Sequence, residues 1–244
     1  MMAAIETLLF DFGGTLDADG VAWKERFYSL YRAEGLDMTA EAFAPAYFAA
    51  DDALVSALPR TAGLSETVHA LAANLETELA RRAEAHGAAP LKGRADSDRG
   101  RRVASRFLSE MFAAFARNRP VLEALGERYR LGVVSNFYGN LEAACERAGL
   151  APLFGVMTDS QRVGAEKPEP AIFHAALSAL NAAPETAVMV GDSLRRDCEG
   201  ARRSGMGFVW IAPESVQALE RGGAERWRVL AAVSALPDLI GVLT

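Results

Sequence analysis

The fold is decided near the start of the chain, by the segment TLLFDFGGTLD at residues 7–17. Its first half is a short apolar run bounded by turn-forming residues, which is typical of a buried β-strand. An acid, Asp11, stands near the end of that run, and a pair of glycines follows it. The segment therefore predicts a buried strand that leads into a polar, tightly turning loop.

Four further apolar runs alternate with stretches of helical periodicity, which indicates βα units around a parallel sheet. These runs occupy residues 131–135, 154–158, 187–192 and 207–211. Amphipathic segments of crossover length lie between them, for example at 141–148 and 171–180. We therefore predict an α/β protein with a Rossmann-like, doubly wound parallel sheet.

More than a hundred residues separate the first run from the second, and they contain no convincing strand. Apolar residues recur there at helical spacing, for example at Leu64, Val68 and Leu71. This pattern predicts an all-helical domain inserted into the core after its first strand. The expected boundaries are residues 1–17 and 117–244 for the core and 18–116 for the helical domain.

Three local features of the helical domain lead to further predictions. The segment 90–100 is rich in proline, glycine and charge, which predicts a loop whose neighbouring arginines, Arg99 among them, face solvent. Gly20 and the stretch near Arg117 to Pro120 are candidate hinges between the two domains. Aromatic residues at helical spacing are expected to pack inside the domain: Phe43, Tyr47 and Phe48.

The composition excludes several classes of protein. Lysine plus arginine number 26 and aspartate plus glutamate 32, a net charge of −6 that argues against a nucleic-acid partner. The two cysteines, Cys145 and Cys198, lack the spacing of a zinc site or a disulfide framework. No apolar run is long enough to span a bilayer and no leader is recognisable, so we expect a cytoplasmic protein without a membrane partner.

Chemically active residues gather after the predicted strands and ahead of one predicted helix. In an open parallel sheet, ligands bind beyond the carboxyl ends of the strands, so these residues are expected to converge at one edge. They are Asp11, Ser135, Asn136, Lys167, Asp192 and Asp197. A carboxylate nucleophile, hydroxyl and amide groups, an ammonium group and an acidic pair would meet there.

In this order, the segments resemble the four motifs of the haloacid dehalogenase superfamily of phosphatases and related hydrolases. The resemblance covers nearly all of the predicted core, and residues 18–116 stand where that family inserts a helical C1-type cap domain. It implies Mg²⁺-dependent hydrolysis of a small phosphorylated metabolite through an aspartyl-phosphate intermediate. We expect the chain to act as a monomer or homodimer.

The resemblance also implies a role for each matching residue. Asp11 would be the nucleophile, and Lys167 would neutralise the charge of the transition state. Carboxylate attack on an anionic phosphate requires a cation between them, which fits a Mg²⁺ site. The expected metal residues are Asp11, Asp192, the backbone carbonyl of Gly13, and Asp197 through metal-bound water. The expected phosphate-binding residues are Ser135, Asn136, Gly14 and Lys167.

One departure from the family pattern leaves alternatives open. Phosphatases of the family usually carry a second aspartate two residues after the nucleophile as general acid and base, and that position is Gly13 here. A phosphatase would then take its proton from Asp17, a cap residue or water. A haloacid dehalogenase attacking carbon from Asp11, and a degenerate member that binds a phosphorylated ligand or a partner without turnover, are the other readings. The acidic pair Asp192 and Asp197 favours the phosphatase, because displacement of halide needs no metal.

Overall fold

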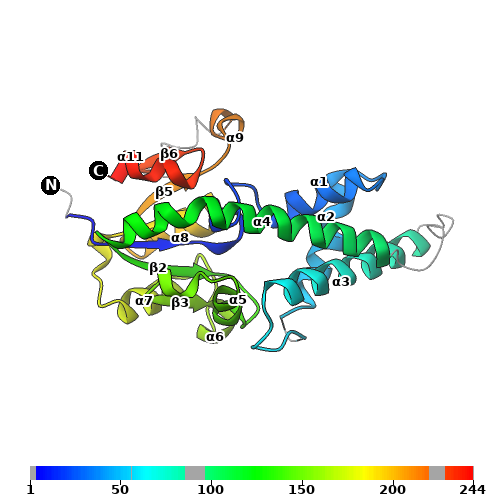
Figure 1. The fold of residues 1–244 in the computed structure, drawn as a ribbon, viewed down its shortest axis with the longest axis horizontal. Coiled ribbons are helices and arrows are strands. Elements are labelled where there is room, and N and C mark those ends of the chain that lie inside the picture. The colour runs from blue at the N-terminus through cyan, green and yellow to red at the C-terminus, as the bar shows by residue number, and fades with distance from the viewer. Residues whose placement is uncertain (1–3, 56, 86–96, 220–228, 244) are drawn as a thin grey trace.

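A computed structural model describes residues 4–55, 57–85, 97–219 and 229–243, and the centre of this described part is one sheet of six parallel strands (Figure 1). The strands are β1 (Thr7–Phe10), β2 (Arg130–Ser135), β3 (Val156–Asp159), β4 (Ala187–Gly191), β5 (Gly207–Ile211) and β6 (Ala231–Val233). Their order in the sheet is β3-β2-β1-β4-β5-β6, and every neighbouring pair is parallel. The first strand therefore lies inside the sheet, between β2 and β4.

The α/β fold and the five expected strands are confirmed, with ends that shift by one or two residues. The structure adds a strand that the sequence did not predict, β6, at the edge of the sheet. It has three residues and two of them are alanines, so it carries little apolar or β-branched signal.

The two faces of the sheet are covered by separate hydrophobic clusters, because successive residues of a strand point to opposite faces. In β1, Leu8 and Phe10 belong to one cluster and Leu9 to the other. The first cluster continues from the sheet into the interior of the helical domain, where it includes Phe27 and Phe43. One continuous core therefore joins the sheet to the helices.

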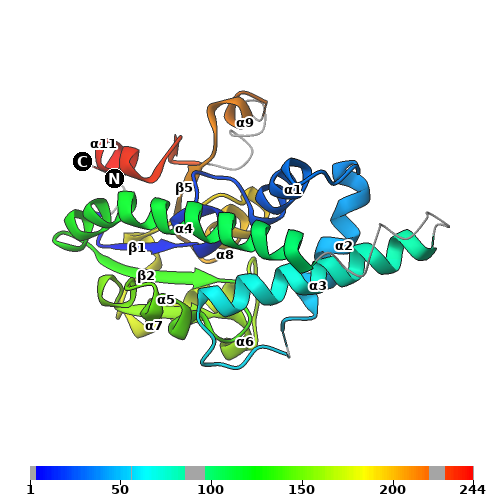
Figure 2. The ribbon, with the colours of Figure 1, turned by 45° about the vertical axis from the view of Figure 1, so that its right-hand side comes forward.

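The helices of the inserted region gather at the end of the molecule opposite the two termini (Figures 1 and 2). They are α1 (Trp23–Ala33), α2 (Ala40–Asp52), α3 (Leu64–Ala85) and the first part of α4 (Ser97–Gly126). Among the described residues between 18 and 116, all regular structure is helical. The expected domain boundary at 117 falls inside α4, which contacts α1 and α3 as well as β2.

The remaining helices and turns surround the sheet. The helices are α5 (Leu141–Arg147), α6 (Ser160–Val163), α7 (Pro170–Ala179), α8 (Glu199–Arg203), α9 (Glu214–Leu219) and α11 (Leu239–Leu243). The short turns are η1 (Phe12–Leu16), η2 (Ala151–Leu153), η3 (Pro184–Thr186), η4 (Leu194–Cys198) and η5 (Leu236–Asp238). The turns η1 and η4 directly follow the ends of β1 and β4, and they carry the residues of the site described below.

The prediction of a loop at 90–100 is wrong for its last residues, because α4 begins at Ser97. Residues 90–96 lie outside the described part of the chain. Arg99 is buried and pairs with the buried carboxylate of Glu76 on α3, at 2.7 Å from Nη2 to Oε2. A partner some 20 residues earlier, which the sequence does not reveal, thus turns this arginine inward.

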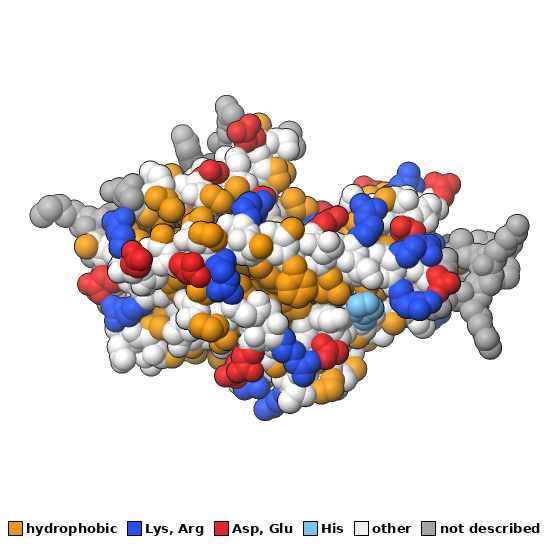
Figure 3. Space-filling model, viewed as in Figure 1, with side chains coloured by type: hydrophobic (Ala, Val, Ile, Leu, Met, Phe, Trp, Pro, Cys, Tyr) orange, Lys and Arg blue, Asp and Glu red, His pale blue; other side chains and the backbone are white. Residues whose placement is uncertain are grey.

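On the face shown in Figure 3, basic and acidic side chains are interspersed. In the described residues, every helix is too short or too polar to cross a lipid bilayer.

Gly20 joins the first turn to the helices, and its backbone leaves no room for a side chain. Its φ is +76°, and an added Cβ would lie 2.4 Å from the Cα of Ala212. Its N–H donates to the carbonyl of Gly14 at 2.8 Å. The predicted hinge position is therefore packed directly against the backbone that follows β5.

Gly20→Ala should lower the free energy of unfolding by about 3 kcal/mol or more, since strained backbone and a backbone clash add together. The matched control is Gly35→Ala, at φ +85° with nothing within 4 Å of the added Cβ, which carries the backbone strain alone. It should cost about 1 kcal/mol. Urea unfolding of both variants measures the difference, and equal losses would contradict the tight packing at Gly20.

Candidate active site

Asp11 lies directly after β1, and all the partners of its carboxylate contact the same one of its two oxygens. Oδ1 accepts hydrogen bonds from the backbone N–H of Phe12 at 2.7 Å and from the Ser135 hydroxyl at 3.0 Å. The same oxygen pairs with Nζ of Lys167 at 2.7 Å. Among the described residues, no hydrogen bond or ion pair engages Oδ2. One oxygen therefore fixes the orientation of the group, and the other is left without a partner among the described residues.

Lys167 is buried between two carboxylates, on the segment that precedes α7. Its Nζ lies 2.7 Å from Asp11 and 2.8 Å from Oδ1 of Asp197. Burial lowers the pKa of Lys167, but the two carboxylates outweigh that effect and the pKa is raised, so the side chain stays charged. The Asn136 side chain holds the backbone of Lys167 in place, accepting from its N–H at 2.8 Å and donating to its carbonyl at 3.2 Å.

Asp11, Asp192 and Asp197 bring carboxylate oxygens within 4.8 Å of one another. Burial raises the pKa of Asp192 well above its ordinary range, and the charges of Asp11 and Asp197 raise it further. Burial also raises the pKa of Asp197, against the opposing effect of Lys167. Lys167, even with the charge of Arg196 acting without direct contact, does not balance three carboxylates. The surplus negative charge and the hard oxygen ligands fit a divalent cation such as Mg²⁺.

The two glycines after Asp11 have different functions. Gly14 has a φ of +86°, and an added Cβ would lie 2.7 Å from Oδ2 of Asp192, so only glycine lets the acid approach. Its N–H donates to Asp17 at 2.6 Å and is therefore already used. Gly13 has a φ of −75°, open to any residue, but an added Cβ would lie 3.0 Å from Nε1 of Trp23.

Asp17, one of the expected sources of a proton, already forms hydrogen bonds with residues around the first loop. Its buried carboxylate accepts from the N–H of Gly14, from Nε1 of Trp23 at 2.7 Å and from Arg26 at 2.7 Å. Burial raises its pKa, and Arg26 acts in the opposite direction. It holds the first loop against α1 and does not line the cavity beside Asp11.

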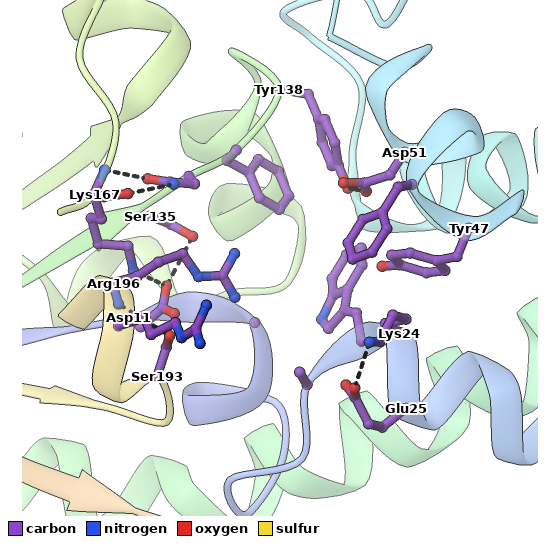
Figure 4. A pocket seen from close by; sticks show the side chains of 17 residues that line it. Asp11, Lys24, Glu25, Tyr47, Asp51, Ser135, Tyr138, Lys167, Ser193 and Arg196 are labelled. Carbon is purple, nitrogen blue, oxygen red and sulfur yellow. Dashed lines mark hydrogen bonds and ion pairs between the residues drawn. The ribbon is translucent and has the colours of Figure 1, made fainter. Parts of the chain in front are cut away.

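A cavity of about 680 Å³ opens beside Asp11, between the sheet and the helical domain (Figure 4). The ends of β1, β2 and β4 supply one side of it, and α1 and α2 supply the other. Phe43 and Tyr47 are buried in the core as expected, and Tyr47 also lines the cavity, as does Phe48. The expectation that Phe48 packs inside the domain is wrong, because 51% of its surface is exposed.

All the predicted polar side chains, from Asp11 through Asp197, converge at this edge of the sheet. Gly13, Ser135, Asn136 and Lys167 also line the cavity, whereas Asp192 and Asp197 lie with Asp11 in the acidic cluster.

The sequence did not reveal three other polar residues of the cavity. Arg196 stands one residue before Asp197 in the predicted motif, yet the spacing does not say which of the intervening side chains faces the cavity. Asp51 on α2 accepts a hydrogen bond of 2.5 Å from the Tyr138 hydroxyl, which comes from the loop after β2. That bond joins the helical domain to the core, and no local pattern could have predicted it.

Comparisons with known sequences find related hydrolases. A family model of haloacid dehalogenase-like hydrolases matches residues 5–205. The bovine haloacid dehalogenase-like hydrolase domain-containing protein 3 is 42% identical over 35% of the chain, and the phosphoserine phosphatase of Thermus thermophilus is 47% identical over 26% of it. These matches span only 34% and 26% of the two relatives' own lengths.

The fold agrees as well. The magnesium-bound HAD hydrolase YfnB of Bacillus subtilis has a TM-score of 0.57 and 20% identity, with 99% of both chains covered. The family match extends from the start of β1 past the end of α8, and so includes every residue of the cluster around Asp11. The chain belongs to the haloacid dehalogenase-like hydrolase family.

Proposed function

We propose that the chain is a Mg²⁺-dependent phosphatase that hydrolyses a small phosphorylated metabolite through an aspartyl phosphate on Asp11. The observation that carries this proposal is how the two oxygens of the Asp11 carboxylate differ in their contacts. Three donors hold Oδ1, whereas Oδ2 is free of partners among the described residues. A carboxylate anchored in this way is oriented for attack without further reorganisation.

The reaction divides into two displacements at phosphorus. In the first, Oδ2 of Asp11 forms a bond to phosphorus while the bond to the ester oxygen breaks, and the departing alkoxide takes up a proton from water. In the second, water attacks the aspartyl phosphate and releases Asp11 and inorganic phosphate. Lys167 and the Ser135 hydroxyl contact Oδ1 of Asp11. We expect both to donate to the phosphoryl oxygens when negative charge develops on them. The backbone N–H of Asn136 is the proposed third donor, and Gly14 lets the chain pass close beneath the phosphate.

Asp11, Asp192 and the carbonyl of Gly13 would hold Mg²⁺, with Asp197 orienting its water. When bound, Mg²⁺ supplies positive charge that offsets the repulsion between the Asp11 carboxylate and the phosphate. Asp197 also has a structural function, because Oδ1 pairs with Lys167 and Oδ2 accepts from the N–H of Ser193 at 2.9 Å.

The size of the cavity supports a small substrate, since pockets for such molecules are typically about 300 to 1,000 Å³. The acidic cluster supports phosphate chemistry over a haloacid dehalogenase reaction. Displacement of halide from carbon by Asp11 has no use for three crowded carboxylates, whereas transfer of an anionic phosphoryl group needs the cation that they attract. The named phosphatase among the relatives points the same way.

Asp11→Asn should abolish phosphate release, because it keeps the shape of the side chain and removes the attacking charge. Circular dichroism should remain that of the wild type. The matched control is Asp19→Asn, which makes the same change at a half-buried carboxylate that is paired with Arg117 and lies outside the cavity. Acid quenching during turnover, followed by mass spectrometry, should find a phosphoryl adduct on the peptide containing Asp11. Near-normal activity of Asp11→Asn would refute the mechanism.

Mg²⁺ should stabilise the wild type by about 2.7 kcal/mol at a hundredfold excess over Kd, because only the folded chain assembles the cluster. Asp192→Asn should remove most of that gain in thermal melting, whereas Glu142→Gln, outside the cluster, should retain it. Chelator should stop phosphate release and added Mg²⁺ should restore it. Full activity in chelator, together with halide release from a haloacid, would assign the chain to the dehalogenases instead.

The glycine at position 13 predicts a steep dependence of kcat on the leaving group. General acid catalysis contributes typically about 10² to 10⁴ in rate, mostly for leaving groups that are poor as anions. Aryl phosphates should therefore react far faster than alkyl phosphates that bind equally well. The measurement is kcat across a series of esters of graded basicity. A flat series would contradict the missing acid and point to a donor on the cap side, which Asp51→Asn would then test.

A further inference from the structure

The charged side chains that line the cavity are not all neutralised by neighbours. Lys167 pairs with the carboxylates beneath it, and Nζ of Lys24 lies 3.1 Å from Glu25. Asp51 accepts a hydrogen bond from the Tyr138 hydroxyl. In contrast, Arg195 and Arg196, which also line the cavity, have no hydrogen bond or ion pair through their guanidinium groups with any residue in the described part of the chain. Of the two, Arg196 is the one whose charge acts on Tyr47 across the cavity. It is a cation inside the cavity without a contact partner.

The position of Arg196 is fixed by the turn that carries it. Its backbone N–H donates to the Ser193 hydroxyl at 3.2 Å, which caps η4. Its side chain reaches into the cavity on the core side and remains accessible (Figure 4). Burial lowers the pKa of Arg196, but the surrounding carboxylates, Asp11 first among them, outweigh that effect. The guanidinium is therefore charged at every working pH.

Across the cavity, the helical domain presents a second unused donor. The Tyr47 side chain is only 5% exposed, yet within the described residues its hydroxyl has no hydrogen-bond partner. Burial, followed by the charge of Asp51, raises the pKa of Tyr47 well above its ordinary range, so the hydroxyl keeps its proton. In Figure 4 the hydroxyl end of Tyr47 points into the cavity, toward the side that carries Arg196.

We propose that Arg196 and Tyr47 form a second anion-binding subsite, so that the substrate is a phosphate ester carrying a further anionic group, a carboxylate or a second phosphate. The proposal rests on the function proposed above, in which the reacting phosphoryl group is bound by Lys167, Ser135 and Asn136. Because those donors bind the reacting phosphoryl group, Arg196 is not needed to bind it. The planar fork of a guanidinium matches the two oxygens of a carboxylate or phosphate, and the hydroxyl adds a neutral donor from the cap side.

A substrate pair that differs only in charge tests this subsite: the phosphate ester of hydroxypropanoate and the phosphate ester of the isosteric hydroxypropanamide. The wild type should prefer the carboxylate in kcat/KM on the order of 10- to 100-fold, the effect of one charged hydrogen bond. Arg196→Gln should bring that ratio close to one, and Tyr47→Phe should reduce it severalfold. Arg203→Gln, which removes the same charge from α8 beside Glu199, should keep the wild-type ratio.

A second pair, propanediol bisphosphate and propanediol monophosphate, distinguishes a second phosphate from a carboxylate as the recognised group. A preference for the charged member in either pair, lost in Arg196→Gln, supports the subsite and identifies its anion. Ratios near one in both pairs for the wild type would overturn it. Equal losses of kcat/KM for the charged and uncharged members in Arg196→Gln would also overturn it. The arginine would then act at the phosphoryl group that all the esters share.

Calorimetric binding to Asp11→Asn separates this inference from the proposed function. If the wild type hydrolyses the esters and Asp11→Asn binds the charged and uncharged members equally, the subsite fails and the phosphatase stands. If the wild type hydrolyses none of the four esters, while Asp11→Asn binds the charged members more tightly through Arg196, the chain recognises doubly anionic phosphates without turning them over. The subsite then survives as a ligand site although the catalytic proposal fails.

Discussion

The structure of the site depends on one buried interaction, the ammonium group of Lys167 held between the carboxylates of Asp11 and Asp197. Bringing an unpaired charge into a protein interior costs several kcal/mol, so each of these groups is tolerable only because the others are there. The three residues come from the end of β1, the segment before α7 and the turn after β4. The attraction of Lys167 for both carboxylates ties three βα units together at the carboxyl edge of the sheet. The Asn136 side chain adds a fourth segment by holding the backbone of Lys167.

The same crowding accounts for the glycines around the cluster. A Cβ on Gly191 would lie 2.3 Å from Oδ2 of Asp197, and one on Gly14 would lie 2.7 Å from Oδ2 of Asp192. Neither clash involves a flexible side-chain end that could move away at low cost, because both acids are fixed at the site. Crowding by the acids does not account for the glycine at position 13. There the backbone accepts any residue, and the indole of Trp23 occupies the space that a side chain would need.

The sequence predicts best what depends on local pattern. Alternating apolar runs locate five strands, and the polar residues after β1, β2 and β4 meet because parallel strands share a carboxyl edge. The direction in which a loop side chain points cannot be predicted from such a local pattern. Nothing in the segment from Ser193 to Asp197 shows that Arg196 turns into the cavity. Contacts between distant segments, such as Tyr138 with Asp51 and Arg99 with Glu76, depend on how the helical domain is seated on the sheet. The three-residue β6 is too short and too alanine-rich for any pattern to emerge.

The continuity of α4 has a mechanical consequence for access to the cavity. Its 30 residues form a rod about 45 Å long that belongs to both parts of the molecule. The other connection runs through Gly20, which is packed against the backbone of Ala212. The two connections between the helical domain and the sheet are therefore a continuous helix, α4, and a tightly packed turn at Gly20. Widening the cavity mouth would bend α4. Pro120 lies within α4 and cannot donate a backbone hydrogen bond, so the bending stiffness is lowest there.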